Sequence, residues 1–237
     1  MFKPLHAHAL IGTAVMALSL ACAPASATLV TSRGALGAAG SLDWAQLGVD
    51  GDVVANGTAA SSSIVGLSAT VSNTTNAGSL MRFDEGAGTW AGNFANGDAL
   101  LSTFDLGGTL RLVFNGGISR IGAQIQGLEY ASFNGIITAY DAGNTVLETY
   151  AVLDALTDGT ANNSAMFLGI SRATADITRV EFSITGQNET IFAINQLSLS
   201  QQVTTTPPPA GVPEPGAMAL VALALGGLAM QRRQRAR

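Results

Sequence analysis

The middle of this 237-residue sequence alternates apolar and polar residues with a period of two, in short runs broken by glycine, asparagine and aspartate. In residues 179–184, for example, Val180, Phe182 and Ile184 alternate with charged or hydroxyl side chains. This period places alternate side chains on opposite faces of a β-strand, so that one face can be buried and the other wet. Further runs of this kind lie at residues 64–71, 80–83, 109–114, 121–126, 136–140, 146–152, 166–170 and 191–199.

Turn-forming residues separate these runs, at positions 115–117, 141–144, 158–159 and 186–188. Between residues 28 and 202 no stretch has a convincing amphipathic helical period, and there is no internal repeat. Closely spaced strands without helices between them point to an antiparallel sandwich or barrel. We expect an all-β fold, a jelly-roll-like β-sandwich over residues 28–202, whose strand order the pattern does not reveal.

The first residues have the order of a secretory signal peptide. Lys3 makes the start weakly cationic, an apolar run follows at residues 9–21, and Ala25-Ser26-Ala27 is a small-x-small cleavage pattern. We expect a signal helix within residues 1–27, cut by signal peptidase after Ala27, with the mature chain starting at Thr28. An alternative uses residues 18–22 as a lipoprotein box with acylated Cys22. The apolar run is short for a lasting anchor, which needs roughly 20 residues.

The last residues fall into four parts. A Thr/Pro-rich linker spans residues 203–211, an apolar segment residues 216–230, and a basic tail residues 231–237. Between linker and apolar segment lies the motif Val212-Pro213-Glu214-Pro215, and the tail holds Arg232, Arg233, Arg235 and Arg237. As a transmembrane helix the apolar segment would measure about 22 Å, short for a hydrocarbon core of roughly 30 Å. The arginines orient it with the basic end in the cytoplasm.

This motif, apolar span and arginine cluster resemble the PEP-CTERM sorting domain, which is also labelled ice-binding protein C-terminal domain. The resemblance covers residues 212–237. It implies that an exosortase recognises the tail and cuts near the motif, so that the helix is a transient anchor in the inner membrane. The protein would then reach the cell surface or the extracellular matrix. The alternative is an ordinary single-pass C-terminal anchor.

Residues 28–202 contain no His, Cys or Lys, which removes many kinds of active site. Nucleophile–histidine pairs, zinc sites of His or Cys ligands, and Schiff-base lysines are excluded. The same residues hold six arginines against fifteen acidic residues, a net charge of −9. Such a charge repels nucleic acid and suits calcium or neutral polymers better. We therefore expect no enzyme activity, no nucleic-acid partner, and no cofactor unless calcium.

Four segments within residues 116–199 resemble the lectin-like or carbohydrate-binding-module-like β-sandwiches found upstream of PEP-CTERM tails. They are residues 121–126, 137–144, 167–171 and 192–199. Such domains often have Asp in the last strand, where this chain has Asn195. If that Asp binds a structural calcium in relatives, the amide here would weaken or abolish the site.

The glycine-rich segment 82–98 is the candidate ligand site. An exposed Trp90 could stack on a sugar ring while Asn93, Asn96 and Asp98 bond its hydroxyls. The alternative is that Trp90 and Phe94 fill the end of the sandwich. Trp44 is expected in the core.

Carboxylates in the same segment could ligate calcium, which prefers oxygen ligands. The candidates are Asp84, Glu85 and Asp98, although the EF-hand spacing is absent.

Three functions remain open. The first is a non-enzymatic, exosortase-sorted surface or matrix protein associated with exopolysaccharide or biofilm. The second is a glycan-binding module, and the third a polysaccharide hydrolase using two opposed carboxylates.

Overall fold

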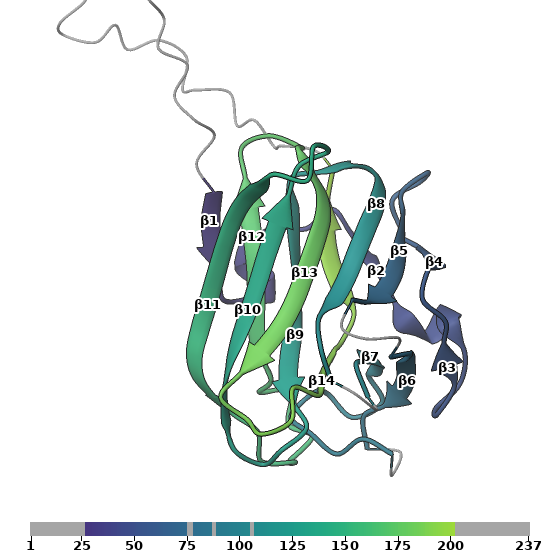
Figure 1. Ribbon diagram of the computed structural model, residues 1–237, viewed down its shortest axis with the longest axis vertical. Helices are drawn as coiled ribbons and strands as arrows, with labels where there is room; N and C mark the ends of the chain where they lie inside the picture. Colours follow the sequence, from purple (N-terminus) through teal and green to yellow (C-terminus); the bar gives the residue numbers. More distant parts are fainter. Residues whose placement is uncertain (1–26, 75–77, 87–88, 105–106, 202–237) are drawn as a thin grey trace, which may run out of the picture.

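The computed structural model describes residues 27–74, 78–86, 89–104 and 107–201. These residues form two antiparallel β-sheets of nine and six strands, here called the large sheet and the small sheet (Figure 1). The expected all-β sandwich is confirmed. Apart from Ala27, the predicted signal peptide lies outside the described residues, as do the linker, the sorting motif, the apolar segment and the arginine tail. No helix within the described ranges is long and apolar enough to cross a membrane.

The large sheet has the order β1-β12-β9-β14-β7-β6-β3, and β15 pairs with both β9 and β2. Its strands are β1 (Ala27–Val30), β2 (Gly40–Leu42), β3 (Val53–Val54), β6 (Leu80–Asp84), β7 (Ala99–Ser102), β9 (Arg120–Gly127), β12 (Met166–Arg172), β14 (Phe192–Ile194) and β15 (Leu197–Ser200). Two short helices accompany them, α1 (Arg33–Leu36) and the 3-10 helix η1 (Trp44–Leu47).

The small sheet has the order β11-β10-β13-β8-β5-β4 and lies in front of the large sheet in Figure 1. Its strands are β4 (Thr58–Ser61), β5 (Ser68–Asn73), β8 (Leu110–Ile118), β10 (Ser132–Tyr140), β11 (Val146–Leu156) and β13 (Ile177–Thr185). The alternation read from residues 179–184 is confirmed, because Val180, Phe182 and Ile184 are all buried in β13. They belong to the main core, which also contains Ile121 and Leu168 of the large sheet.

Strand β9 departs from simple alternation. Its inner residues, Ile121, Ala123 and Ile125, belong to the main core, but Gln124 and Gln126 on the other face are buried too. Helix α1, Phe167 and the loops around residues 91–94 and 158–165 cover that outer face. Amide side chains thus lie in a buried setting, where each polar atom needs a partner.

Three local predictions were wrong. The strand expected at residues 64–71 begins only at Ser68, because residues 64–67 form a turn in which the Leu67 amide donates to the Ile64 carbonyl. Residues 115–117 continue β8 instead of turning, because the Asn115 side chain bonds the neighbouring hairpin: it accepts from the Ser68 amide and donates to the Gly66 carbonyl, both at 2.9 Å. The expected single strand at residues 191–199 is broken at residues 195–196 into β14 and β15. The turn at residues 141–144 is confirmed, with Asn144 at φ 62°.

Candidate functional site

Trp90 does not offer its ring to solvent. The residue is 2 % exposed, and its ring lies 5.9 Å from that of Phe83, in a small apolar cluster that also holds Phe94 and Leu100. Leu101, the neighbour of Leu100 on β7, points into the main core, so the cluster covers the outer face of the large sheet. The expectation of an exposed stacking ring at Trp90 is therefore corrected. Trp90 and Phe94 are buried packing residues, although not at the end between the sheets.

Asn93 is buried and holds a loop in place. Its Nδ2 donates to Asp158, to Thr160 Oγ1 (3.1 Å) and to Ser164 Oγ (3.2 Å), and its Oδ1 accepts from the Asp158 amide at 2.8 Å. These bonds occupy the amide. Hydrogen bonds from the Thr160 hydroxyl and, with a smaller effect, from Asn93 Nδ2 keep the pKa of the Asp158 carboxyl below its usual range.

Asn96 is exposed, whereas Asp98 is half-buried and accepts from the side chain of Asn195 at 2.9 Å. The structure therefore does not bring Trp90, Asn93, Asn96 and Asp98 together around one opening.

The calcium candidates have other partners. Asp84 pairs with Arg82, and Glu85 is buried with its Oε1 accepting from the Gly92 amide at 2.7 Å. Burial raises the pKa of Glu85; the amides of Gly92 and Phe94 oppose this, and the charge of Asp98 adds to it. In the part of the chain that the structure describes, no three acidic side chains gather in a way that could hold a metal ion.

Asn195, at the break between β14 and β15, is the centre of a buried polar network. Its Oδ1 accepts from the Gln124 amide (3.0 Å) and from Arg33 Nη2 (2.9 Å). Its Nδ2 donates to Gln124 Oε1 (2.6 Å) and Asp98 Oδ2 (2.9 Å), and its carbonyl accepts from Trp44 Nε1 at 2.9 Å. Trp44 is fully buried, as expected. An ionised carboxylate at position 195 could not donate these two hydrogen bonds, so the network requires the amide of Asn195.

Arg33 is the first residue of α1, whose N-cap Ser32 accepts from the Ala35 amide. Its Nη1 donates to the Gln196 carbonyl (3.0 Å) and to Ser198 Oγ, and its guanidinium carbon lies 5.4 Å from the centroid of the Phe167 ring. Burial lowers the pKa of Arg33, and the charge of Asp98 opposes that shift.

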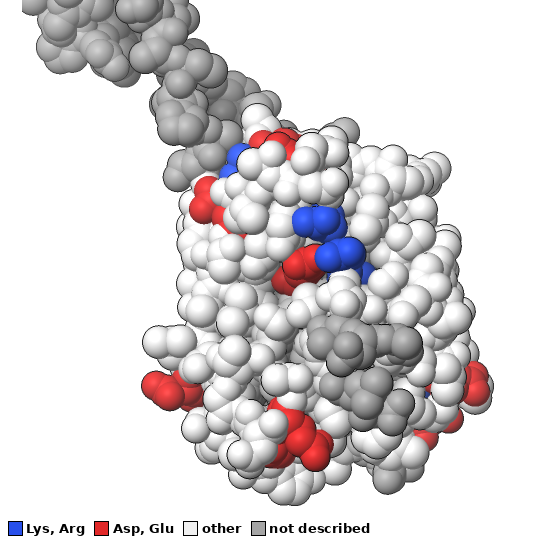
Figure 2. Space-filling view, viewed as in Figure 1, with Lys and Arg blue, Asp and Glu red and all other residues white. Residues whose placement is uncertain are grey.

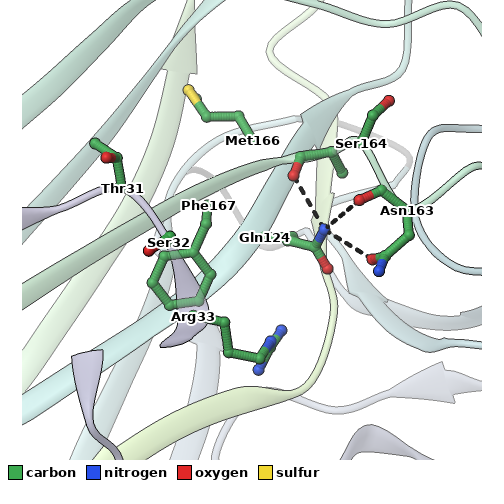
Figure 3. Close-up of a pocket in the computed structure, with 9 residues that line it drawn as sticks. Thr31, Ser32, Arg33, Gln124, Asn163, Ser164, Met166 and Phe167 are labelled. Atoms are coloured by element: carbon green, nitrogen blue, oxygen red, sulfur yellow. Dashed lines mark hydrogen bonds between the residues drawn. The ribbon is translucent and has the colours of Figure 1, made fainter. Parts of the chain in front are cut away.

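A pocket of about 410 Å³ opens beside Arg33. Figure 3 shows its walls: Thr31, Ser32 and Arg33 on one side, and Gln124, Asn163 and Ser164 on the other, with Phe167 and Met166 between them. Gln124 Nε2 fixes the far wall by donating to the Asn163 carbonyl, Asn163 Oδ1 and the Ala165 carbonyl, at 3.0–3.2 Å. The pocket therefore combines hydroxyls, amides and a guanidinium.

Sequence reasoning missed this pocket. Arg33, Gln124 and Asn163 come from distant segments, and no local motif surrounds Arg33. The available signal was weak: the polar positions of β9 carry amides instead of charges, which is compatible with burial.

The small sheet presents a different surface. Figure 2 shows basic and acidic groups side by side near the middle of this face. Arg111 lies 2.8 Å from Glu181, and Arg179 stacks on Tyr140, whose hydroxyl donates to Glu181 at 2.7 Å. These charges are paired with each other.

Comparison with solved structures finds distant similarities to other proteins. The module CsCBM6-3 from Clostridium stercorarium, described in complex with cellobiose, has a TM-score of 0.29 and 13 % identity over 52 % of this chain and 82 % of that one. A DUF4465 family protein from Bacteroides caccae has a TM-score of 0.37 and 10 % identity over 74 % of this chain and 100 % of that one. Neither similarity is close enough to support an argument about function. No curated protein matches the sequence.

The C-terminal residues give a specific match. Residues 211–234 fit the family model described as the PEP-CTERM protein-sorting motif, in agreement with the motif, apolar span and arginines read from the sequence. The chain therefore carries a PEP-CTERM sorting signal.

Proposed function

We propose that this chain is a non-enzymatic surface or extracellular-matrix protein whose β-sandwich works in association with exopolysaccharide, as in a biofilm. The PEP-CTERM motif at residues 211–234 carries the proposal. The motif implies export, a C-terminal membrane anchor, and processing by signal peptidase and exosortase. The absence of His, Cys and Lys from residues 28–202 supports a role without catalysis.

The first test concerns the tail. In the producing bacterium, changing Pro213, Glu214 and Pro215 together to alanine should leave the chain unprocessed in the membrane fraction. The control changes Pro207, Pro208 and Pro209 to alanine, which alters the same number of nearby positions but leaves the motif intact. Fractionation and mass measurement compare the two. Processing of the motif variant to the same mass and location as the parent would refute the proposal.

The proposal that the protein has no catalytic activity has its own test. The exported protein, incubated with the polysaccharide of the producing cells, should leave the chain length of the polymer unchanged in size-exclusion chromatography. Shortening of the polymer would favour the hydrolase alternative instead, in which two carboxyl groups do the chemistry.

Glycan binding is the second candidate function, and the pocket beside Arg33 favours it. Sugar sites combine hydrogen-bonding groups with a concave surface, and this pocket has hydroxyl and amide walls. A glycan array with the exported protein tests this function. Absence of any saccharide ligand, with or without calcium, would exclude it.

A further inference from the structure

Arg33 is a half-buried cation that lacks a carboxylate partner. None of the ion pairs between described residues includes it, whereas four other arginines each lie within 4 Å of a carboxylate: Arg82, Arg111, Arg172 and Arg179. The groups that Arg33 contacts are neutral oxygens of Asn195, Gln196 and Ser198 and the ring of Phe167. The carboxylate that affects the pKa of Arg33 is that of Asp98, which accepts from Asn195 Nδ2, whereas Arg33 donates to Asn195 Oδ1. The positive charge of Arg33 is therefore not neutralised by direct contact with a carboxylate within the described part of the chain.

The bonds that hold Arg33 leave two of its N–H groups without an acceptor among the described residues. Of the five N–H groups of an arginine, both on Nη1 and one on Nη2 are used by the three oxygens above. Among described residues the Nε–H and the second Nη2–H have no acceptor. In a guanidinium, Nε–H and the neighbouring Nη2–H form one edge, from which a carboxylate can accept with both oxygens.

The position of Arg33 is fixed before any ligand arrives. Three hydrogen bonds and the Phe167 ring, itself 6 % exposed, hold the guanidinium against the sheet. A rigid cation loses little conformational entropy when it binds, which favours recognition by a single residue.

The rest of the pocket matches a sugar ring better than a peptide. Its rim is made of hydroxyl and amide side chains, Thr31, Ser32, Asn163 and Ser164, and its volume of about 410 Å³ lies within the range of small-molecule sites, about 300–1,000 Å³. The Thr31 hydroxyl and Asn163 Nδ2 make no hydrogen bond to another described residue, and both residues line the pocket and are exposed.

We propose that this pocket binds an acidic sugar unit, with Arg33 holding its carboxylate through Nε and Nη2 and the rim bonding its hydroxyls. As the natural source of such a ligand we take the exopolysaccharide, so this part rests on the proposed function. The net charge of residues 28–202 opposes an acidic polymer at long range, but physiological salt screens charges beyond about 8 Å, so at contact the charge of Arg33 dominates.

The test uses calorimetric titration of the exported protein with an oligogalacturonate and with its methyl ester. The ester keeps the shape of the ligand and removes its charge. We expect the acid to bind about 10- to 100-fold more tightly than the ester, the ratio that corresponds to one charge-assisted interaction. Equal affinities, or no binding of the acid at millimolar concentration, would overturn the proposal.

Three variants assign the effect to the pocket. Arg33→Gln should reduce affinity for the acid to that for the ester. Thr31→Trp should block the opening while Arg33 keeps its bonds; because Thr31 is exposed, this variant should fold even if Arg33→Gln does not. Arg179→Gln is the matched control, an arginine over an aromatic ring on the small sheet, and should bind as the parent does. Undiminished binding by folded Thr31→Trp or Arg33→Gln contradicts the assignment.

The two proposals can fail separately. If Arg33→Gln is recovered with the cell matrix as the parent is, but no longer binds the acid in vitro, the proposed function and the binding pocket both stand, as independent properties. Tight and selective acid binding by a protein that never reaches the matrix would refute the proposed function and keep the pocket.

Discussion

The two tryptophans of the chain are both buried, but only Trp44 has a hydrogen bond from its ring N–H to another described residue. Trp44 Nε1 donates to the Asn195 carbonyl at 2.9 Å, whereas Trp90 Nε1 is buried without a partner among the described residues. Changing either tryptophan to phenylalanine therefore removes a similar volume of ring, but the two changes differ in their effect on hydrogen bonding.

The expected difference follows from the cost of an unpaired buried group. Trp44→Phe leaves the carbonyl of Asn195 without its donor, at about 1–3 kcal/mol beyond the packing loss. Trp90→Phe also loses packing contacts, but the ring N–H that it removes had no hydrogen-bond partner among the described residues. The free energy of unfolding should thus fall by about 1–3 kcal/mol more for Trp44→Phe than for Trp90→Phe.

Urea unfolding of the exported protein, followed by circular dichroism, measures both values, and the remaining tryptophan reports on its own region by fluorescence. For a domain of this size each kcal/mol also lowers Tm by about 2–4 °C. An equal loss in the two variants, or a larger loss for Trp90→Phe, would refute the assigned hydrogen bonds. A Trp90→Phe variant with unchanged stability but altered glycan affinity would reinstate Trp90 as a ligand contact.

Two further predictions concern Glu85 and Gly117. Because burial raises the pKa of Glu85 in the folded state, its contribution to stability is greatest below the unfolded value of 4.5 and is lost as the pH rises through the folded pKa. Glu85→Gln keeps an acceptor for the Gly92 amide without the charge, so urea unfolding at pH 4 and pH 8 should show a smaller decline than in the parent; an unchanged decline would exclude Glu85 as its source. Gly117→Ala places a Cβ at 2.1 Å from the Ala175 carbonyl oxygen and should cost about 1–3 kcal/mol. Gly34→Ala, where no atom lies within 4 Å, is its control, and equal stability of the two variants would contradict the packing at Gly117.

Local alternation predicted the long strands well because one of their faces packs on the main core. β13 is the clearest case, with Val180, Phe182 and Ile184 inside. The short strands β2 and β3 could not be found in this way, since they contain only three and two residues and depend on pairing with distant partners. Residues 115–117 look like a turn by composition, but side-chain bonds to the neighbouring hairpin keep them in the strand.

The candidate site was less predictable than the fold. The segment around Trp90 has the composition of an exposed loop, yet it folds over the outer face of the large sheet and buries the ring. Arg33, Gln124 and Asn195 meet only after β9, β14 and β15 have paired, so no local pattern contains them. The tail, by contrast, was readable because its motif, apolar span and arginines are contiguous in sequence.

The register of the large sheet also determines how the sandwich responds to mechanical force. Ala27 pairs with Arg172, while Ser171 and Ser200 both pair with Arg120, so the first and last strands begin and end at one level of the sheet, about 14 Å apart across three strand spacings. A pull on the chain beyond Ser200, as from a tether, acts along the axis of β15. The load is then shared by the hydrogen bonds of β15 with β9 and with β2 at the same time, instead of breaking them one after another. A sandwich held by its C-terminal end in flowing medium would thus meet drag through a strand that is paired on both of its edges.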